Sequence, residues 1–127
     1  ADLDAAARVI PRERVLYLIW RKPWMTVAHD TYIASTLGRA GWETIAPASG
    51  ARYPAVDDDD PVWRAADRIL LSSEPFAFRE RDACALAAST GKPVQLIDGE
   101  MTSWYGPRAI EGLRYLAHLR ARPLAAP

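Results

Sequence analysis

The chain has 127 residues, which suits a single domain, and half of them are hydrophobic, which is enough to form a substantial core. Its 16 basic and 16 acidic side chains give a formal net charge of zero, so its composition provides no basis for binding nucleic acid or an anionic membrane. No apolar run approaches the roughly 20 residues that a membrane span needs. The first residues, ADLDAAAR, lack the basic start and apolar middle of a signal peptide.

Strand and helix patterns alternate along the chain. The continuous apolar run RVLYLIW is typical of a strand that is buried on both faces. The expected strands are residues 14–20, 43–46, 67–72 and 92–97. The expected helices are residues 30–40, 61–66, 79–88 and 105–120. Four such alternations predict an α/β fold, a three-layer αβα arrangement around a central parallel four-stranded sheet.

Proline and glycine mark the boundaries between these elements. Pro23 predicts that residues 21–26 form a loop, because proline does not continue a central strand. Gly41 and Gly91 are plausible helix ends. The one cysteine, Cys84, excludes an internal disulfide, and its small neighbours favour packing as a small hydrophobic residue.

Aromatic residues gather in the loops that follow the expected strands. In a parallel sheet these loops meet at one edge, where ligands bind. The aromatic residues of this edge are Trp20, Trp24, Tyr53, Phe76, Phe78, Trp104 and Tyr105. Such rings suit stacking on a large flat ligand or docking of a partner protein, and the alternative is that they cover their own core.

Carboxylates follow two of the same strands. Glu74 and Glu100 could act as acid/base partners, bind a ligand or share a metal with Asp98, or all three could serve as caps and turn residues. The sequence has no Gly-rich phosphate loop and no G-x-S-x-G elbow. His29 and His118 fall at expected helix ends rather than beside a serine, so catalysis is not favoured.

A run of four acidic residues precedes the short expected helix at 61–66. Asp57, Asp58, Asp59 and Asp60 form either a solvated turn that charges the start of this helix or a docking point for an Arg-bearing partner.

Five stretches, in this order, resemble a known family. They are RVLYLIWRKPW (14–24), DTYI (30–33), RYP (52–54), ADRILLSSEPF (66–76) and KPVQLIDGEMTSWYG (92–106). Together they resemble the C-terminal lobe of helical-backbone metal receptors. This is the class III group of periplasmic substrate-binding proteins, which serve ABC transporters and include binders of vitamin B12 and of siderophores.

The resemblance implies a fold with two α/β lobes joined by one long helix, with ligand bound between the lobes. Residues 1–12 would then be the end of the connecting helix, 13–122 the C-terminal ligand-binding lobe and 123–127 a tail. The N-terminal lobe is missing from the chain, so the resemblance implies that this lobe or a second chain is a partner. It also implies an ABC permease as partner and a periplasmic or extracytoplasmic location. Without a signal peptide, a cytoplasmic location stays open.

The resemblance also implies roles for individual residues. It implies that Trp20, Trp24, Tyr53, Glu100 and Trp104 bind the ligand, and the loop positions described above add Glu74 and Tyr105 to these ligand-binding residues. Asp57 to Asp60 would include the carboxylate that docks on the permease. The ligand would be cobalamin or another metal chelate, with no intrinsic cofactor, no metal ligated by the protein and no catalysis. The alternatives are a soluble interaction domain of the same fold without a transport role, and a small enzyme that uses Glu74 and Glu100.

Overall fold

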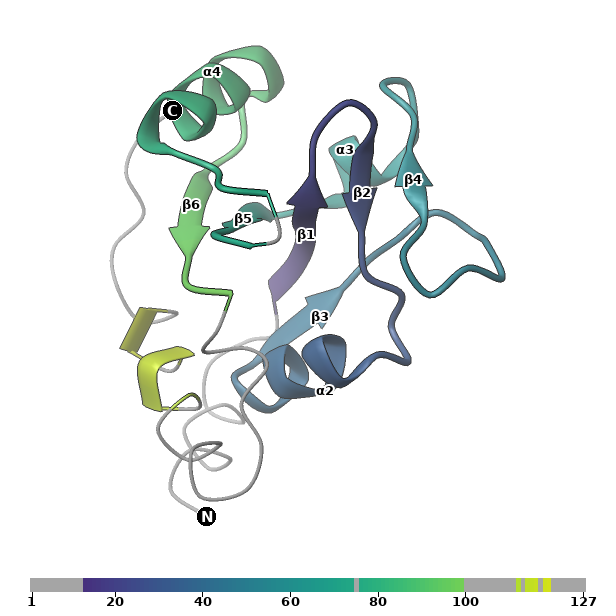
Figure 1. Cartoon of the computed structure of the whole chain (residues 1–127), viewed down its shortest axis with the longest axis vertical. Coiled ribbons are helices and arrows are strands. Elements are labelled where there is room, and N and C mark those ends of the chain that lie inside the picture. Colours follow the sequence, from purple (N-terminus) through teal and green to yellow (C-terminus); the bar gives the residue numbers. More distant parts are fainter. Residues whose placement is uncertain (1–12, 75, 100–111, 113, 117, 120–127) are drawn as a thin grey trace.

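A computed structural model describes residues 13–74, 76–99, 112, 114–116, 118 and 119. Figure 1 shows strands in the middle of the molecule and helices around them. The strands are β1 (Glu13–Trp20), β2 (Trp24–Thr26), β3 (Trp42–Thr44), β4 (Ala55–Val56), β5 (Arg68–Ser72) and β6 (Val94–Ile97). The helices are α2 (Tyr32–Arg39), α3 (Val62–Ala65) and α4 (Glu80–Thr90).

Four parallel strands form the centre of the sheet, in the order β3-β1-β5-β6. Strand β1 pairs with β5 through Leu16 and Ile69, and β5 pairs with β6 through Leu70 and Gln95. Strand β3 pairs in parallel with the first residues of β1. The predicted α/β fold with four parallel strands is therefore confirmed, each strand within two residues of its expected limits.

Two antiparallel strands were not predicted, so the sheet that the structure describes is mixed and six-stranded. Residues 21–23 form a turn, and β2 runs back along the second half of β1 and pairs in turn with β4. The prediction that residues 21–26 form a loop was wrong for Trp24–Thr26. Pro23 lies in the turn before β2, where it removes no hydrogen bond from the strand.

Both faces of the sheet are covered, which explains why the middle residues of β1 (15–18) and of β5 (69–71) are hydrophobic on both sides of the strand. On one face Val15 and Tyr17 pack with Leu37 of α2 and with Leu116 and Leu119 of the last helical segment. On the other face the core joins β1 and β5 to α3 and α4. The residues of this second core are Leu16, Leu18, Val56, Val62, Ala66, Ile69, Leu71, Phe78, Ala83 and Leu86. The three-layer αβα arrangement is confirmed.

Local sequence signals set the helix limits. The Thr31 hydroxyl accepts a hydrogen bond from the Ala34 amide at 3.2 Å and caps the start of α2. Gly91 ends α4 with φ of 71°, a left-handed conformation that glycine adopts without strain. The expected ends at Gly41 and Gly91 are thus confirmed, and Gly41 also has a positive φ of 98°.

Three expected segments lie partly or wholly outside the described residues, and one expectation, for Cys84, was wrong. Of the helix expected at 105–120, Gly112, residues 114–116, His118 and Leu119 are helical, and the remaining residues lie outside the described part. The proposed connecting helix at 1–12 and tail at 123–127 also lie outside it. Cys84 was expected to be packed, but it lies on the exposed side of α4. Its neighbour Ala83 is the residue that α4 directs into the core.

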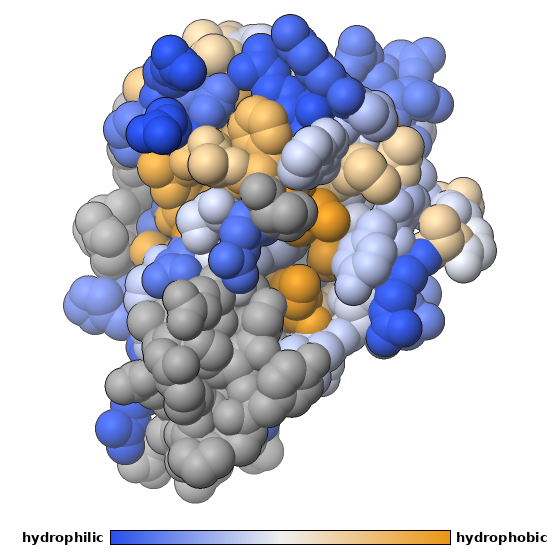
Figure 2. Space-filling model, in the orientation of Figure 1, coloured by the Kyte–Doolittle hydropathy of each residue, from blue (hydrophilic) through white to orange (hydrophobic). Residues whose placement is uncertain are grey.

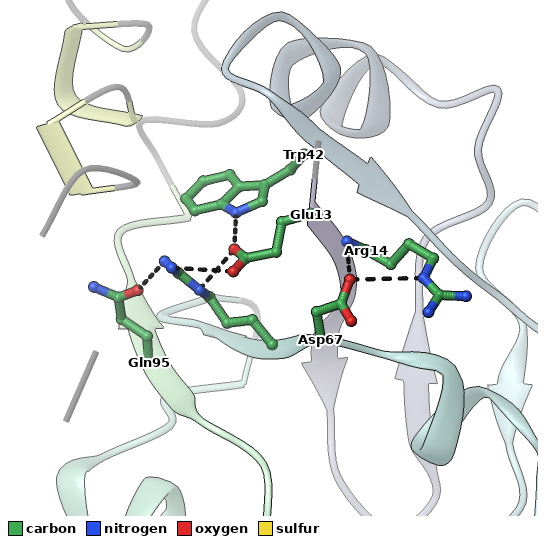
Figure 3. Close-up of polar contacts among 6 residues, drawn as sticks. Glu13, Arg14, Trp42, Asp67 and Gln95 are labelled. Carbon is green, nitrogen blue, oxygen red and sulfur yellow. Dashed lines mark hydrogen bonds and ion pairs between the residues drawn. The ribbon is translucent and has the colours of Figure 1, made fainter. Parts of the chain in front are cut away.

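A buried arginine connects the amino-terminal ends of the parallel strands. The Arg68 side chain is only 3% exposed, and its Nε lies 2.9 Å from Oε1 of Glu13 on β1. One guanidinium nitrogen donates to Gln95 Oε1 on β6 at 2.9 Å, and the guanidinium lies 5.5 Å from the Trp42 ring of β3. The Trp42 indole in turn donates to Glu13 at 2.9 Å. Figure 3 shows Gln95, Glu13 and Trp42 converging on this group.

We predict that Arg68→Ala lowers the free energy of unfolding by about 3 kcal/mol, because it leaves the largely buried Glu13 carboxylate without its cation. Arg14→Ala is the matched control. Arg14 pairs with Asp67 at 3.6 Å, but both side chains are about half exposed, at 52% and 46%. Its loss should therefore lower the unfolding free energy by less than about 1 kcal/mol. Urea unfolding measures both effects, and equal losses would contradict the prediction.

Candidate functional site

A pocket of about 540 Å³ opens at the carboxyl-terminal ends of the central strands. This is the edge where parallel sheets place their ligands. The described residues that line it are Tyr17, Ile19, Trp20, Met25, Ile33, Tyr53, Ser72, Glu74 and Gly99. Apolar and aromatic side chains dominate the wall, the end of β5 adds the Ser72 hydroxyl and the Glu74 carboxylate, and the exit of β6 adds Gly99.

A β-bulge brings two consecutive residues of β1 to the pocket. The pairing of β1 with β2 shifts register between Leu18 and Trp20, where Trp20 faces Met25. A bulge bends the strand and changes the direction of the side chain that follows it. As a result Ile19 and Trp20 both line the pocket, although neighbouring residues of a regular strand point to opposite faces.

Two aromatic rings of the pocket wall are exposed. Trp20 is 39% and Tyr53 46% exposed, high values for large hydrophobic side chains. Backbone hydrogen bonds from Thr26 to Pro54 and from Ala28 to Arg52 hold the segment that carries Tyr53 beside β2. Figure 2 shows hydrophobic surface in the middle of the viewed face, with hydrophilic residues around it. Exposed apolar surface of this kind suits a binding site.

Hydrogen bonds hold the turn after β5 to β1 on one side and to the end of β6 on the other. The Ser72 hydroxyl donates to the carbonyl oxygen of Glu74 at 2.7 Å and accepts from the Glu74 amide at 3.3 Å. The Ser73 hydroxyl accepts from the Gly99 amide at 3.0 Å, and the Ser73 amide donates to Ile97. The Phe76 amide donates to Ile19 at 3.3 Å. These bonds fix the backbone that carries Glu74 between β1 and β6.

Gly99 allows this turn and the exit of β6 to approach closely. A Cβ atom at Gly99 would overlap the Ser72 hydroxyl and lie 2.8 Å from Cγ of Glu74. Real Cβ contacts almost never occur at such distances, so glycine is required here by space. The missing side chain lets the Glu74 stem pack directly on the β6 exit.

The structure brings together Trp20, Tyr53 and Glu74 of the predicted ligand-binding residues. Trp24 lies elsewhere: it stacks on Phe78 with ring centres 6.2 Å apart and packs on the core beneath α3 and α4. The pleat of β2 directs its neighbour Met25 into the pocket instead. The other predicted residues, Glu100, Trp104 and Tyr105, lie outside the described residues.

Several lining residues were missed by the sequence analysis. Tyr17 and Ile19 were assigned to the strand, although their alternation with Leu16 and Leu18 shows that they share a face. Ile33 was assigned to the expected helix at 30–40 and was given no place in the binding site. Met25 could not have been found, because β2 itself was not predicted. Ser72 and Gly99 carried a usable signal, since each ends or follows a strand at the ligand edge.

The acidic run lies beside a second pocket of about 490 Å³. Asp60 has a structural role, since its Oδ1 accepts from the Val62 amide at 2.9 Å at the start of α3. Asp57 contributes its backbone oxygen, which accepts from the Trp63 indole at 2.8 Å. The side chains of Asp58 and Asp59 are exposed and line the pocket together with Asp60.

Among the residues that the structure describes, no group of three or more His, Cys, Asp or Glu side chains is arranged to hold a metal ion. None of the helices found there has the length and apolar character for crossing a membrane.

No protein-family model and no curated protein sequence matches the chain. Solved structures do match. The periplasmic vitamin B12-binding protein of Vibrio cholerae superimposes with a TM-score of 0.68 at 18% identity, over 92% of this chain and 47% of that protein. A possible iron-binding periplasmic solute-binding protein of Staphylococcus epidermidis gives 0.70 at 18% identity, over 95% and 51%. An ABC-type Fe3+-hydroxamate transport protein of Saccharomonospora viridis gives 0.64 at 16% identity, over 95% and 45%.

The chain thus spans about half the length of the proteins that it matches. It has the fold of one lobe of the periplasmic substrate-binding proteins, and the predicted resemblance to their class III group is confirmed at the level of the fold. That this is the C-terminal lobe stays a prediction.

We predict that Gly99→Ala lowers the unfolding free energy by about 1–3 kcal/mol, because the added methyl group must displace Ser72 and Glu74. Gly50→Ala is the matched control, since nothing lies within 4 Å of a Cβ atom at Gly50. That change should stay within about 0.5 kcal/mol of zero. Chemical denaturation measures both values. Ser72→Ala in the Gly99→Ala background should recover part of the loss, and strict additivity of the two changes would refute the proposed clash.

Proposed function

We propose that this chain is a ligand-binding lobe of a substrate-binding protein that delivers cobalamin or a related metal chelate to an ABC importer. The lobe binds its ligand at the pocket lined by Trp20, Tyr53 and Glu74 and performs no chemistry on it. The observation that carries the proposal is this pocket: two exposed rings over an apolar wall, at the ligand edge of a binding-protein lobe.

The shape and composition of the pocket suit a flat, largely apolar ligand with a polar periphery. Exposed Trp and Tyr rings stack well on conjugated macrocycles, and a few polar groups then orient the ligand. One matched protein is named for vitamin B12 and others for iron or Fe3+-hydroxamate, so metal chelates are the ligand class that the comparisons support. Among metal chelates we prefer cobalamin, because the exposed Trp20 and Tyr53 rings suit stacking on its macrocycle.

A second wall must come from outside the described lobe. Small-molecule sites usually bury 70–90% of a ligand's surface, and one open face does not achieve this. We propose that an N-terminal lobe or a second chain closes over Trp20 and Tyr53, because this chain spans about half the length of the matched proteins. The proposal places the protein in the periplasm or another extracytoplasmic space, and fractionation of cells that express the full gene tests this.

We predict that cyanocobalamin quenches the tryptophan fluorescence of this chain saturably, beyond a free-tryptophan control for inner-filter absorbance. Trp20→Ala should weaken binding at least about fivefold, because a ring that contacts the ligand contributes about 1 kcal/mol or more. Trp24→Phe is the control, since Trp24 packs beneath α3 and α4. Its affinity should equal that of the unmodified chain.

The outcomes separate the alternatives. Loss of binding in Trp24→Phe but not in Trp20→Ala would place the ligand elsewhere. If cyanocobalamin gives no saturable quenching, and still gives none after the upstream lobe is added, the corrinoid proposal fails. The pocket would then serve another chelate or a protein partner, and the interaction-domain alternative would gain support.

We also propose that the acidic run docks on the importer's permease. Asp58 and Asp59 are exposed, whereas Asp60 caps α3 and Asp57 lies in the turn that binds the Trp63 indole. Two adjacent carboxylates without a structural task suit recognition of arginine on a partner.

Asp58→Asn together with Asp59→Asn should weaken binding to the permease several-fold, because rim charges mainly assist encounter with a partner of opposite charge. Affinity for the ligand and the unfolding free energy should not change. Co-sedimentation with permease-containing lipid nanodiscs at low and high salt measures the effect. Asp30→Asn with Glu43→Gln removes the same charge elsewhere and is the control; an equal loss there would show a net-charge effect instead of docking.

A further inference from the structure

We infer that Glu74 makes the pocket selective for ligands whose periphery carries hydrogen-bond donors or positive charge, and against ligands whose periphery carries carboxylates. This inference rests on the proposed function and specifies its ligand class. Among chelates of similar size, it favours those edged by amides, amines or hydroxyls.

Glu74 is the single charged side chain among the described residues that line the pocket. The rest of that wall is aromatic, aliphatic, hydroxyl or glycine. Within the described part of the chain, the structure gives the Glu74 carboxylate no ion pair. Its negative charge is therefore not neutralised by a described neighbour, although water and salt partly screen it because Glu74 is exposed.

The chain holds Glu74 in place. Ser72 bonds to both backbone groups of Glu74, and Ser73 ties the same turn to Gly99. The Glu74 stem packs against Gly99 so closely that a methyl group there would not fit. A side chain whose base is fixed in this way loses less freedom when its carboxylate binds a donor.

Cations near this edge are directed elsewhere. Arg21, Arg79 and Arg81 line a separate pocket of about 310 Å³ around the start of α4. The ring centres of Trp20 and Phe76 lie 5.5 Å apart, and Trp20 lines the ligand pocket while Phe76 lines the pocket around the start of α4. Arg21 is further held by Asp82 at 3.0 Å.

Arg52 is also directed away from the ligand pocket. It precedes Tyr53 in the sequence, but it lines a different groove on the side of His29 and Glu43. Tyr53 lines the first pocket, whereas Arg52 lines the separate groove. The carboxylate thus faces the ligand without a described arginine beside it.

The test compares cyanocobalamin with a monocarboxylate made by hydrolysing one of its peripheral amides. The two ligands share one chromophore and one ring system and differ by a single negative charge. By calorimetry, the unmodified chain should bind cyanocobalamin at least about threefold more tightly than the monocarboxylate, the size expected for one partly screened charge pair. Glu74→Gln should bring this ratio close to one. Glu43→Gln, which removes an exposed charge outside the pocket, should leave the ratio unchanged.

The dependence of this affinity ratio on ionic strength distinguishes an electrostatic role of Glu74 from a merely structural one. The ratio should fall as salt rises from about 0.01 M to about 1 M, because the Debye length shortens from about 30 Å to about 3 Å. Binding of both ligands with a ratio near one, or a ratio that Glu74→Gln leaves unchanged, overturns the inference and leaves the proposed function standing. If neither ligand binds this chain, and neither binds after an N-terminal lobe is added, the proposed function for corrinoids is overturned, and the inference with it.

Discussion

The Arg68–Glu13 ion pair fixes how the parallel strands meet. Arg68 on β5 reaches Glu13 on β1, Gln95 on β6 and the Trp42 ring on β3, so one guanidinium connects all four parallel strands. A buried ion pair adds little net stability compared with apolar packing, but a cation left there without its partners is strongly unfavourable. A strand paired in another register would leave Arg68 in that state. The pair therefore selects the register, and the register determines where the opposite ends of the strands lie.

Those opposite ends form the pocket, and two local features give it its shape. The bulge in β1 turns Trp20 to the same side as Ile19, and Gly99 lets the β6 exit pack on the turn that carries Glu74. Neither feature involves a reactive group. The site is thus defined by backbone geometry at one edge of the sheet, with polar groups presented by a turn that Ser72 and Ser73 fasten.

The sequence predicted what depends on local pattern and missed what depends on pairing. Continuous apolar runs identified β1 and β5, and Gly91 identified a helix end, because burial and backbone conformation leave a local signature. Strand β2 has three residues after a proline turn, and only its partners β1 and β4 make it a strand. Once β2 is known, the pleat assigns Met25 to the pocket and Trp24 to the core. Trp20 and Tyr53 line a pocket at the predicted edge, while the place of Trp24 depended on pairings that no local pattern records.

The described pocket is open on one side, and this affects the affinity that the lobe alone has for a ligand. The total affinity for a ligand includes contacts from whatever covers Trp20 and Tyr53, so the affinity of this chain alone understates that of a closed site. A ratio between two ligands that differ at one peripheral group is less affected. A covering wall that treats both ligands alike contributes equally to both free energies of binding, and its contribution cancels in the ratio. Discrimination that arises from Glu74 is therefore a property of this lobe itself, and it should be measurable even where binding is weak.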